Sequence, residues 1–269
     1  RIVNVVWIFD VDGVITDPEK KVITNPNLTL EIASKIQGNE PIAFVTGRNL
    51  GFVENRVVAP IISRVHNPEL LDNLFVSGEF AGTSLEYENG QKLYLVNQDI
   101  SVPQEIAQQS RRIAQEFSDS MFFDENKKTM VSIEMKDGLS VAKFKPRQKQ
   151  LTPKLRRILK DHNASEQFEI HEDRIATNIR DKRANKTYAA RQVIDWLKKK
   201  RIKPQKYIVF GDAPGDKEMV DEIYRNGLPV TLVYVGERQE IEKEVSPSYP
   251  VIFTQKKLDQ GTLEYLDSI

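Results

Sequence analysis

The sequence predicts an α/β protein built on a doubly wound parallel sheet, with a smaller α+β domain inserted into it. Two observations predict this class. Short apolar runs rich in β-branched residues alternate with amphipathic helical stretches near both ends of the chain, which is typical of a parallel sheet covered on both faces. The middle third instead alternates helices with pairs of strands, which indicates antiparallel pairing. The 269 residues suffice for two domains, and we expect a core at 1–98 and 179–269 with an insertion at 99–178.

The expected core is a Rossmann-like sheet whose strands and helices alternate along the chain. The apolar runs that predict buried strands are Val3–Phe9, Pro41–Thr46, Asn73–Val76, Lys206–Phe210, Pro229–Val235 and Val251–Phe253. The stretches with helical spacing are Leu28–Ile36, Gly51–Ile62, Thr187–Lys199 and Lys217–Asn226. Asn49 is a suitable cap for the second helix, and Gly227 ends the last one.

The expected insertion contains two helices, each followed by a pair of strands. The helices are Glu105–Phe117 and Pro153–His162. The first strand pair is Thr129–Lys136, where apolar and polar residues alternate, and Leu139–Phe144, joined by an Asp137-Gly138 turn. The second strand pair is Gln167–His171 and Arg174–Ile179.

The composition argues against several classes of function. Lysine and arginine total 39, as do aspartate and glutamate, so the net charge is zero, which disfavours a general nucleic-acid binder. The lack of cysteine excludes disulfides, thiol nucleophiles and cysteine metal sites. No apolar run reaches the roughly 20 residues of a membrane helix, and the first residues show no signal-peptide pattern. We therefore expect a cytoplasmic enzyme, monomeric or homodimeric, without a nucleic-acid or membrane partner.

Two aspartates come at the end of the first predicted strand. Asp10 and Asp12 stand two residues apart, directly before Gly13. If the strand continues, both side chains point to the same side of the sheet. Carboxylates at the end of a buried strand are costly unless a metal or hydrogen bonds match their charge. The stretch therefore has two interpretations, an Asp-Gly turn between strands and a site for a hard cation.

Thr46, Gly47 and Arg48 follow the second predicted strand. Parallel sheets bind ligands at the carboxyl ends of their strands. A hydroxyl and adjacent backbone N–H groups at this edge can hold a phosphate, helped by the N-terminus of the next helix. The alternative is a plain strand-to-helix turn that needs the backbone freedom of Gly47.

The strand Lys206–Phe210 is followed by a second acidic pair, Asp212 and Asp216. Asp216 can equally be a helix N-cap, whereas no helix begins at Asp212. Two acidic pairs at two strand ends supply the carboxylates that Mg²⁺ prefers, with waters and a phosphate completing its octahedron. Lys186 opens the preceding helix and is either a solvated charge or a cation that holds a phosphate. Its neighbours Arg180, Lys182 and Arg183 compete for the same role.

In this order, the four segments resemble the motifs of the haloacid dehalogenase phosphohydrolase superfamily. They are Asp-Val-Asp-Gly-Val-Ile-Thr, Thr-Gly-Arg, a lysine before a helix, and Gly-Asp-Ala-Pro-Gly-Asp. The spacing resembles the subgroup with a large α/β cap between the second and third motifs. This subgroup includes Cof-like sugar phosphatases, sucrose-phosphate and trehalose-phosphate phosphatases, mannosyl-3-phosphoglycerate phosphatase and phosphomannomutase.

A further segment, Phe75–Glu79, resembles the Asn-Gly-Ala segment of that subgroup, which precedes a core hairpin and then the cap. Two positions depart from the family pattern, because Ser77 and Gly215 each replace an asparagine. The departures leave the implied metal ligands intact. They put in doubt the hydrogen bonds that surround those ligands and the contacts to the substrate.

The resemblance also implies a mechanism. Asp10 would be the nucleophile that forms an aspartyl-phosphate, and Asp12 would protonate the leaving alkoxide and then deprotonate a water. The implied ligands of Mg²⁺ are Asp10, Asp12 through its backbone carbonyl and Asp212, and Asp216 is implied either to bind the ion directly or to support its ligands. The implied contacts to the phosphoryl group are Thr46 and Lys186, with Gly13, Gly47 and Arg48 as further substrate contacts.

The insertion is expected to select the substrate by closing over the core, since the core alone binds any phosphate. Lys143 and Lys145 alternate with Ala142 and Phe144, so on the predicted strand they share one face. They are either the solvated face of the sheet or contacts for a second anionic group on the substrate.

The leading interpretation is a magnesium-dependent phosphatase acting on a small phosphorylated metabolite, and a sugar phosphate is the first candidate. The alternatives are a phosphomannomutase-like phosphosugar mutase and a non-catalytic phosphate-binding regulatory protein of the same fold. A phospho-accepting receiver module shares the parallel sheet and the acidic pocket, but receivers are much shorter and lack an insertion. Release of inorganic phosphate separates a phosphatase from a mutase.

Overall fold

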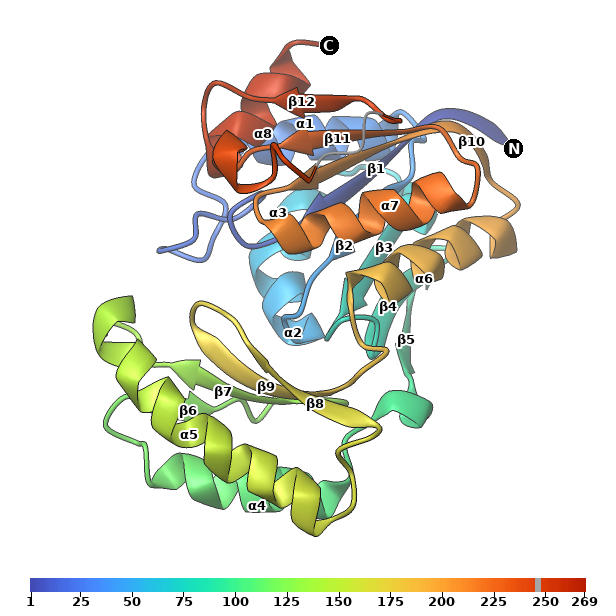
Figure 1. Cartoon of the computed structure of the whole chain (residues 1–269). Coiled ribbons are helices and arrows are strands. Elements are labelled where there is room, and N and C mark those ends of the chain that lie inside the picture. The colour runs from blue at the N-terminus through green and yellow to red at the C-terminus, as the bar shows by residue number, and fades with distance from the viewer. Residues whose placement is uncertain (245–247) are drawn as a thin grey trace. The chain divides into compact units, whose positions relative to one another are not determined.

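The computed structural model describes residues 1–244 and 248–269, and the chain divides into two compact units (Figure 1). The first unit comprises Arg1–Leu95 and Asn185–Ile269, and the second comprises Val96–Ala184. Both ends of the chain thus build the first unit, and the predicted insertion, 99–178, lies within the second. The α/β class predicted from the sequence is confirmed.

The first unit contains an eight-stranded sheet in the order β12-β11-β10-β1-β2-β3-β4-β5. Its strands are β1 (Ile2–Asp10), β2 (Ile42–Val45), β3 (Leu74–Gly78), β4 (Thr83–Glu88), β5 (Gln91–Val96), β10 (Lys203–Gly211), β11 (Val230–Tyr234) and β12 (Val251–Phe253). The strands from β12 to β3 pair in parallel, whereas β4 is antiparallel to β3. Every predicted core strand is present, as is the core hairpin that the family resemblance implied.

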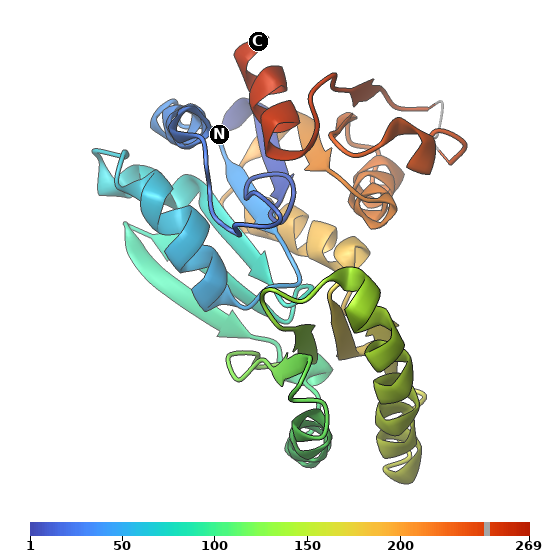
Figure 2. The same cartoon turned by 90° about the vertical axis from the view of Figure 1, so that its left-hand side faces the viewer.

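Helices cover both faces of this sheet (Figures 1 and 2). One apolar core joins the sheet to α1 (Pro26–Gln37), to the helical segment after β2 and to α8 (Leu258–Asp267). A second apolar core joins the opposite face to α6 (Lys186–Lys199) and α7 (Lys217–Arg225). Successive residues of a strand face opposite sides, so Phe9 of β1 packs in the first core and Ile8 in the second.

The helical segment after β2 was predicted as one helix, Gly51–Ile62. It consists of α2 (Leu50–Val53), a π-helical turn η1 (Glu54–Val58) and α3 (Ala59–Ile62). Pro60 has no N–H to donate to the carbonyl four residues earlier, so the α-helical hydrogen-bond pattern is interrupted in this segment. The remaining short turns are the 3₁₀ segments η2 (Pro68–Asn73), η3 (Gln98–Ile100), η4 (Pro214–Asp216) and η5 (Arg238–Glu240).

The second unit is a four-stranded antiparallel sheet with two helices on one face (Figure 1). In sheet order its strands are β6 (Met121–Phe123), β7 (Val131–Met135), β9 (Ala176–Asp181) and β8 (Phe168–Glu172). The helices are α4 (Gln104–Gln115) and α5 (Val141–Asp161). Ile133, Phe144 and Ile179 are fully buried in the core between the sheet and these helices.

The predicted strand Leu139–Phe144 is wrong, and the predicted helix Pro153–His162 is only the last part of α5. This helix begins after Ser140, whose side chain accepts a hydrogen bond from the Lys143 N–H at 3.2 Å. It continues through Pro146 and Pro153. Lys143 and Lys145 therefore lie on a helix and do not share the face of a strand. The antiparallel partners of β7 are β6 and β9.

Candidate active site

The carboxyl ends of three neighbouring parallel strands bring the predicted catalytic segments together. Asp10 is the last residue of the central strand β1, Thr46 follows β2, and Asp212 follows β10. The strand register pairs Asp10 with Val45, so Thr46 comes directly beside it. Phe9 pairs with Phe210 on the other side. The site thus lies at the edge where parallel sheets bind ligands.

Three carboxylates form what we call the acid cluster, namely Asp10, Asp212 and Asp216. One oxygen of each lies within 4.8 Å of the others. The ammonium group of Lys186 joins the cluster, with its Nζ 3.0 Å from Asp10 Oδ1 and in contact with Asp216 Oδ1. Asp10 and Asp216 are 8% and 1% exposed. The acid cluster and Lys186 therefore bring three carboxylates and one ammonium group together in a largely buried environment.

Local hydrogen bonds set the positions of these groups. Asp216 Oδ2 accepts from the backbone N–H of Asp212 at 2.9 Å and of Ala213 at 3.2 Å. Asp216 therefore holds the loop after β10, and its side chain does not cap α7 as the alternative interpretation had it. Asn185 accepts from the Tyr188 N–H at 2.9 Å and caps α6, which fixes Lys186 as the first residue of that helix.

The excess of negative charge is visible in the pKa values of the cluster. Burial raises the pKa of Asp10, and the charge of Asp216 raises it further. Burial and the charge of Asp10 likewise raise the pKa of Asp212. Burial alone would lower the pKa of Lys186, but the charges of Asp10 and Asp216 outweigh it and raise that pKa. Additional positive charge at this place would stabilise all three acids as carboxylates.

The acid cluster has the donor set of a hard divalent cation. Its donors are carboxylate oxygens, which Mg²⁺ prefers over nitrogen or sulfur. One ammonium group does not balance three carboxylates, so a cation of charge two fits the site electrostatically as well as chemically.

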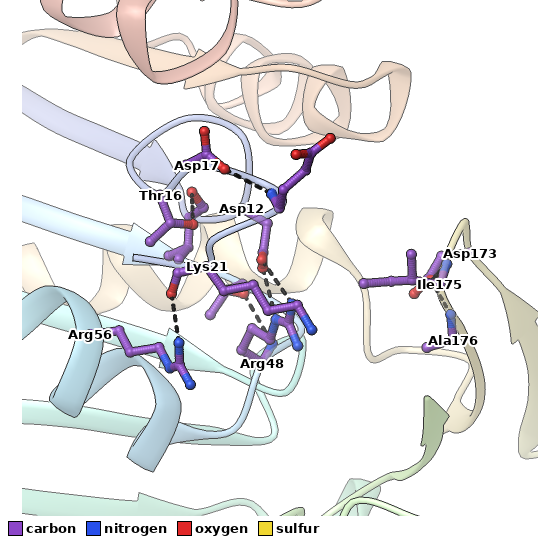
Figure 3. Close-up of polar contacts among 12 residues, drawn as sticks. Asp12, Thr16, Asp17, Lys21, Arg48, Arg56, Asp173, Ile175 and Ala176 are labelled. Atoms are coloured by element: carbon purple, nitrogen blue, oxygen red, sulfur yellow. Dashed lines mark hydrogen bonds and ion pairs between the residues drawn. The ribbon is translucent and has the colours of Figure 1, made fainter. Parts of the chain in front are cut away.

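Asp12 lies outside the acid cluster and is held by Arg48 (Figure 3). The guanidinium donates from Nε to Asp12 Oδ2 at 3.0 Å and from Nη2 to Asp12 Oδ1 at 2.9 Å. Thr46 is buried, and its Oγ1 accepts from the Arg48 N–H at 3.0 Å. Because that hydroxyl accepts from the backbone, its own hydrogen is available to a ligand at the sheet edge.

The Thr46–Arg48 segment is supported by the turn after β3. The N–H groups of Glu79 and Phe80 donate to the carbonyls of Arg48 and Thr46 at 3.0 and 3.1 Å. Glu79, Phe80 and Ala81 all have positive φ angles, of 51°, 51° and 73°. A Cβ atom at Gly47 would lie 2.6 Å from the Phe80 ring, so only glycine fits against this turn.

The remaining predicted residues have the following places. Gly13, in the loop after β1, has a φ of +76° and lies against Asp212. In the second unit, Lys143 is exposed, and Lys145 Nζ donates to Gln148 Oε1 and to the Asp173 carbonyl, both at 2.9 Å. The argument for a substrate contact was that these two lysines share the face of a strand. Because they lie on a helix, that argument no longer holds, and the contact stays a prediction.

Figure 3 also shows the turn between β8 and β9, where Asp173 Oδ1 accepts from two backbone N–H groups.

Ser77 and Gly215, the two departures from the family pattern, have different surroundings. Ser77 is buried, and its hydroxyl donates to Gln192 Oε1 of α6 at 2.7 Å. A Cβ atom at Gly215 would meet nothing within 4 Å. Ser77 therefore contributes a bond between β3 and α6, whereas position 215 has room for a larger side chain.

Sequence reasoning missed two features of the site. It assigned Arg48 to the substrate and did not foresee its pairing with Asp12, because nothing in the spacing sets the direction of a side chain across two loops. It also missed the left-handed turn at Glu79–Ala81, since no glycine or asparagine occupies those positions to indicate positive φ.

Comparisons with known proteins agree with this geometry. Residues 7–227 match the family described as haloacid dehalogenase-like hydrolase. A search of curated proteins finds no match. Among the residues that the structure describes, no helix is long and apolar enough to cross a membrane.

Several solved structures share the fold. The C-terminal domain of C. albicans trehalose-6-phosphate phosphatase has a TM-score of 0.64 at 15% identity, covering 98% of this chain and 91% of that one. Thermoplasma acidophilum 0175 has a TM-score of 0.58 at 13% identity, covering 100% and 98%. N-terminally truncated, IMP-bound Plasmodium falciparum IMP-nucleotidase has a TM-score of 0.57 at 11% identity, covering 98% and 68%. At such identities the likeness establishes the fold alone.

Proposed function

The chain belongs to the haloacid dehalogenase-like hydrolase family, and on that premise we propose that it is a magnesium-dependent phosphatase of a small phosphorylated metabolite. The observation that carries the proposal is the acid cluster with Lys186, in which a buried carboxylate at a strand end lies 3.0 Å from an ammonium group. A trehalose-6-phosphate phosphatase and an IMP-nucleotidase share the fold. We take a sugar phosphate as the first candidate substrate.

In the first step, an oxygen of Asp10 attacks phosphorus and the bond between phosphorus and the ester oxygen breaks. Asp12, protonated and with one oxygen released from Arg48, donates its proton to the departing alkoxide, and an aspartyl-phosphate remains on the enzyme. Oδ1 of Asp10 already contacts Lys186 and accepts from the Val11 N–H at 2.8 Å. Oδ2 is therefore the oxygen that we assign to the attack.

In the second step, Asp12 takes a proton from water while the water oxygen attacks phosphorus. The bond between phosphorus and the Asp10 oxygen breaks, which releases inorganic phosphate and restores both aspartates. Thr46 donates its hydroxyl hydrogen to a phosphoryl oxygen, and Lys186 neutralises charge that develops there. Asp10, Asp212 and the Asp12 carbonyl would hold Mg²⁺. When bound, the ion offsets the repulsion between carboxylate and phosphate.

The Asp10→Asn variant tests the nucleophile. We expect Mg²⁺-dependent hydrolysis of p-nitrophenyl phosphate to fall by about 10³-fold or more, because an amide is not a nucleophile in this reaction. Thermal unfolding followed by circular dichroism should show that the variant stays folded.

Asp17→Asn is the matched control, since Asp17 lies in the same loop. Its Oδ1 accepts from the N–H groups of Glu19 and Lys20 at 2.9 and 2.8 Å, as an amide oxygen also can. We expect this variant to keep wild-type activity. Hydrolysis by Asp10→Asn at the wild-type rate would contradict the proposal.

The identity of the product separates the phosphatase from the alternatives. A phosphatase releases inorganic phosphate from a sugar monophosphate, a phosphosugar mutase returns an isomer, and a regulatory protein returns the substrate unchanged. Assays of phosphate release across a set of phosphorylated metabolites, with and without Mg²⁺, therefore test the reaction class and identify the substrate together.

A further inference from the structure

The strand β5 (Gln91–Val96) forms one edge of the large sheet (Figure 1). Among the residues that the structure describes, no strand pairs with its outer side. Alternate residues of such an edge strand direct backbone N–H and C=O groups outward, where another strand can bind them. The sheet can therefore be extended at β5 by a further strand.

The side chains of β5 are apolar for an edge strand. Tyr94, Leu95 and Val96 follow one another in the chain and are 47%, 53% and 36% exposed. Proteins normally protect an edge with charged residues, a proline, a bulge or a very short strand. β5 has six residues and no proline, and its only charged residue is Lys92. Any protection of this edge by its own side chains therefore depends on Lys92.

The charge of Lys92 is matched by a neighbouring carboxylate. Lys92 Nζ lies 3.0 Å from Glu54 Oε2, and the Tyr94 hydroxyl donates to the same oxygen at 2.7 Å. The ammonium and the carboxylate together are neutral. The edge therefore carries no net charge that would repel an identical edge.

The hairpin that contains β5 is held in a fixed conformation. Asn89 and Gly90, which join β4 to β5, have φ angles of 51° and 76°, as a two-residue hairpin turn requires. Asp72 accepts from the N–H groups of both residues at 3.0 Å. Because the strand is already ordered, pairing with another strand costs little conformational entropy.

We propose that β5 is a self-association surface, at which two copies of this chain pair their β5 strands antiparallel about a two-fold axis near Tyr94. A second copy supplies the extended, neutral and apolar strand that this edge fits, and the axis gives both copies identical contacts. Such an interface is at the small end of the range for specific complexes, so we expect a reversible dimer with a Kd on the order of 10 µM. The inference does not depend on the proposed function, because no residue of β5 belongs to the acid cluster.

Sedimentation equilibrium of the purified full chain measures the association. We expect the average mass to rise from 30.9 kDa at about 1 µM toward twice that value at about 200 µM. A mass that stays at 30.9 kDa over this range would overturn the proposal and would leave a strand of another protein as the occupant of the edge.

Two substitutions place a charge on the edge. Tyr94→Lys sets two ammonium groups opposite each other across the axis, and Leu95→Lys places one among apolar side chains. We expect each to weaken association about 10-fold or more. The matched controls are Tyr224→Lys on α7 and Leu30→Lys on α1, where the original side chains are each 44% exposed. These controls make the same changes of residue and charge on other elements, and they should associate as the wild type does.

Circular dichroism should show that all four variants are folded, because each replaces an exposed side chain. If both charged edge variants associate as tightly as the wild type, the dimer forms through another surface and the proposal is overturned.

The position of the axis can be tested by cross-linking, since the chain has no cysteine of its own. Directly opposed residues of antiparallel strands have Cα atoms about 4.5–5.5 Å apart, a separation that a disulfide spans. Tyr94→Cys should form a covalent dimer on mild oxidation, and Tyr224→Cys should not. Failure of Tyr94→Cys to cross-link at a concentration where it dimerises would overturn the assignment of the axis.

Discussion

Asp216 uses both of its carboxylate oxygens within the protein. Oδ2 accepts from two backbone N–H groups of the loop after β10, and Oδ1 contacts Lys186. A carboxylate so engaged is a weaker candidate for direct metal binding than Asp10 or Asp212. We therefore expect Asp216 to fix Lys186 and the backbone of Asp212, and expect the ion to lie nearer the other two acids.

Gly13 provides a test of the position of Asp212. A Cβ atom at Gly13 would lie 2.3 Å from Asp212 Oδ2, and its φ of +76° already disfavours other residues. The Gly13→Ala variant should displace the Asp212 carboxylate from the acid cluster. We expect the Mg²⁺ concentration for half-maximal hydrolysis of p-nitrophenyl phosphate to rise about 10- to 100-fold.

Gly215→Ala is the control for that experiment, because a Cβ atom there meets nothing within 4 Å. It should keep the wild-type Mg²⁺ requirement, and Gly215→Asn, which matches the family pattern, should be tolerated equally well. An unchanged Mg²⁺ requirement in Gly13→Ala would show that Asp212 does not hold the ion.

At the scale of elements, α6 and α7 are joined by a buried glutamate. Glu222 of α7 accepts from Arg191 of α6 at 2.8 Å and from Arg225 at 2.7 Å. Charge-assisted hydrogen bonds contribute about 1.5–3 kcal/mol. Because the two arginine side chains are 57% and 60% exposed, solvent weakens the pairs, and we expect Glu222→Gln to lower the free energy of unfolding at pH 7 by about 1–2 kcal/mol.

The pH dependence of this loss follows from the pKa of Glu222. Hydrogen bonding from Arg191, against the effect of burial, lowers that pKa from 4.5 to about 2. A lowered pKa in the folded state adds stability that is fully present above the unfolded value and is lost as the pH falls toward the folded value. Urea unfolding at several pH values measures the difference in the free energy of unfolding between wild type and Glu222→Gln. We expect this difference to be constant above about pH 5 and to shrink below it.

The control is Glu218→Gln, an exposed change on the same helix. Its free energy of unfolding should differ from that of wild type by less than about 0.5 kcal/mol at every pH.

The core elements were predictable because buried parallel strands appear in the sequence as continuous runs of apolar residues. The run Val3–Phe9 lies within β1, and its carboxyl end is continuously buried. The same regularity placed Asp10, Thr46 and Asp212 near one another, since parallel strands end at a common edge. The pairing of Asp12 with Arg48 was not predictable, because it depends on loop conformation and side-chain direction rather than on strand order.

Helix α5 shows where sequence patterns failed. The Asp137-Gly138 turn and the alternation at Ala142–Lys145 suggested a strand, and a helix was expected only from Pro153 onward. The observed helix of 21 residues instead contains Pro146 and Pro153, which are normally unfavourable inside a helix. The stronger signal was the helical spacing of buried residues, as at Phe144, Leu151 and Leu155. Packing of this face against the sheet outweighs the helix-breaking tendency of two prolines, an effect that local propensity does not contain.

At the scale of the whole molecule, the chain forms two units with separate apolar cores. The cores on the two faces of the large sheet draw only on the first unit, and the third core draws only on the second. The structural relatives cover 98% of the chain or more, so the combination of both units belongs to the shared fold. Units with separate cores are expected to open separately.

Hydrogen exchange of two matched variants tests this independence. Phe144 in the second unit and Phe44 in the first are both fully buried, at 0% exposure, and shortening either to leucine should cost about 1–2 kcal/mol. We expect Phe144→Leu to speed amide exchange in peptides from 96–184 and to leave peptides from 1–95 and 185–269 near their wild-type rates. Phe44→Leu should give the reverse pattern. If either variant speeds exchange equally throughout the chain, the units unfold as one, because a local loss of packing is then felt only through global unfolding. The selective outcome would mean that the acid cluster, built wholly from the first unit, keeps its structure while the second unit opens.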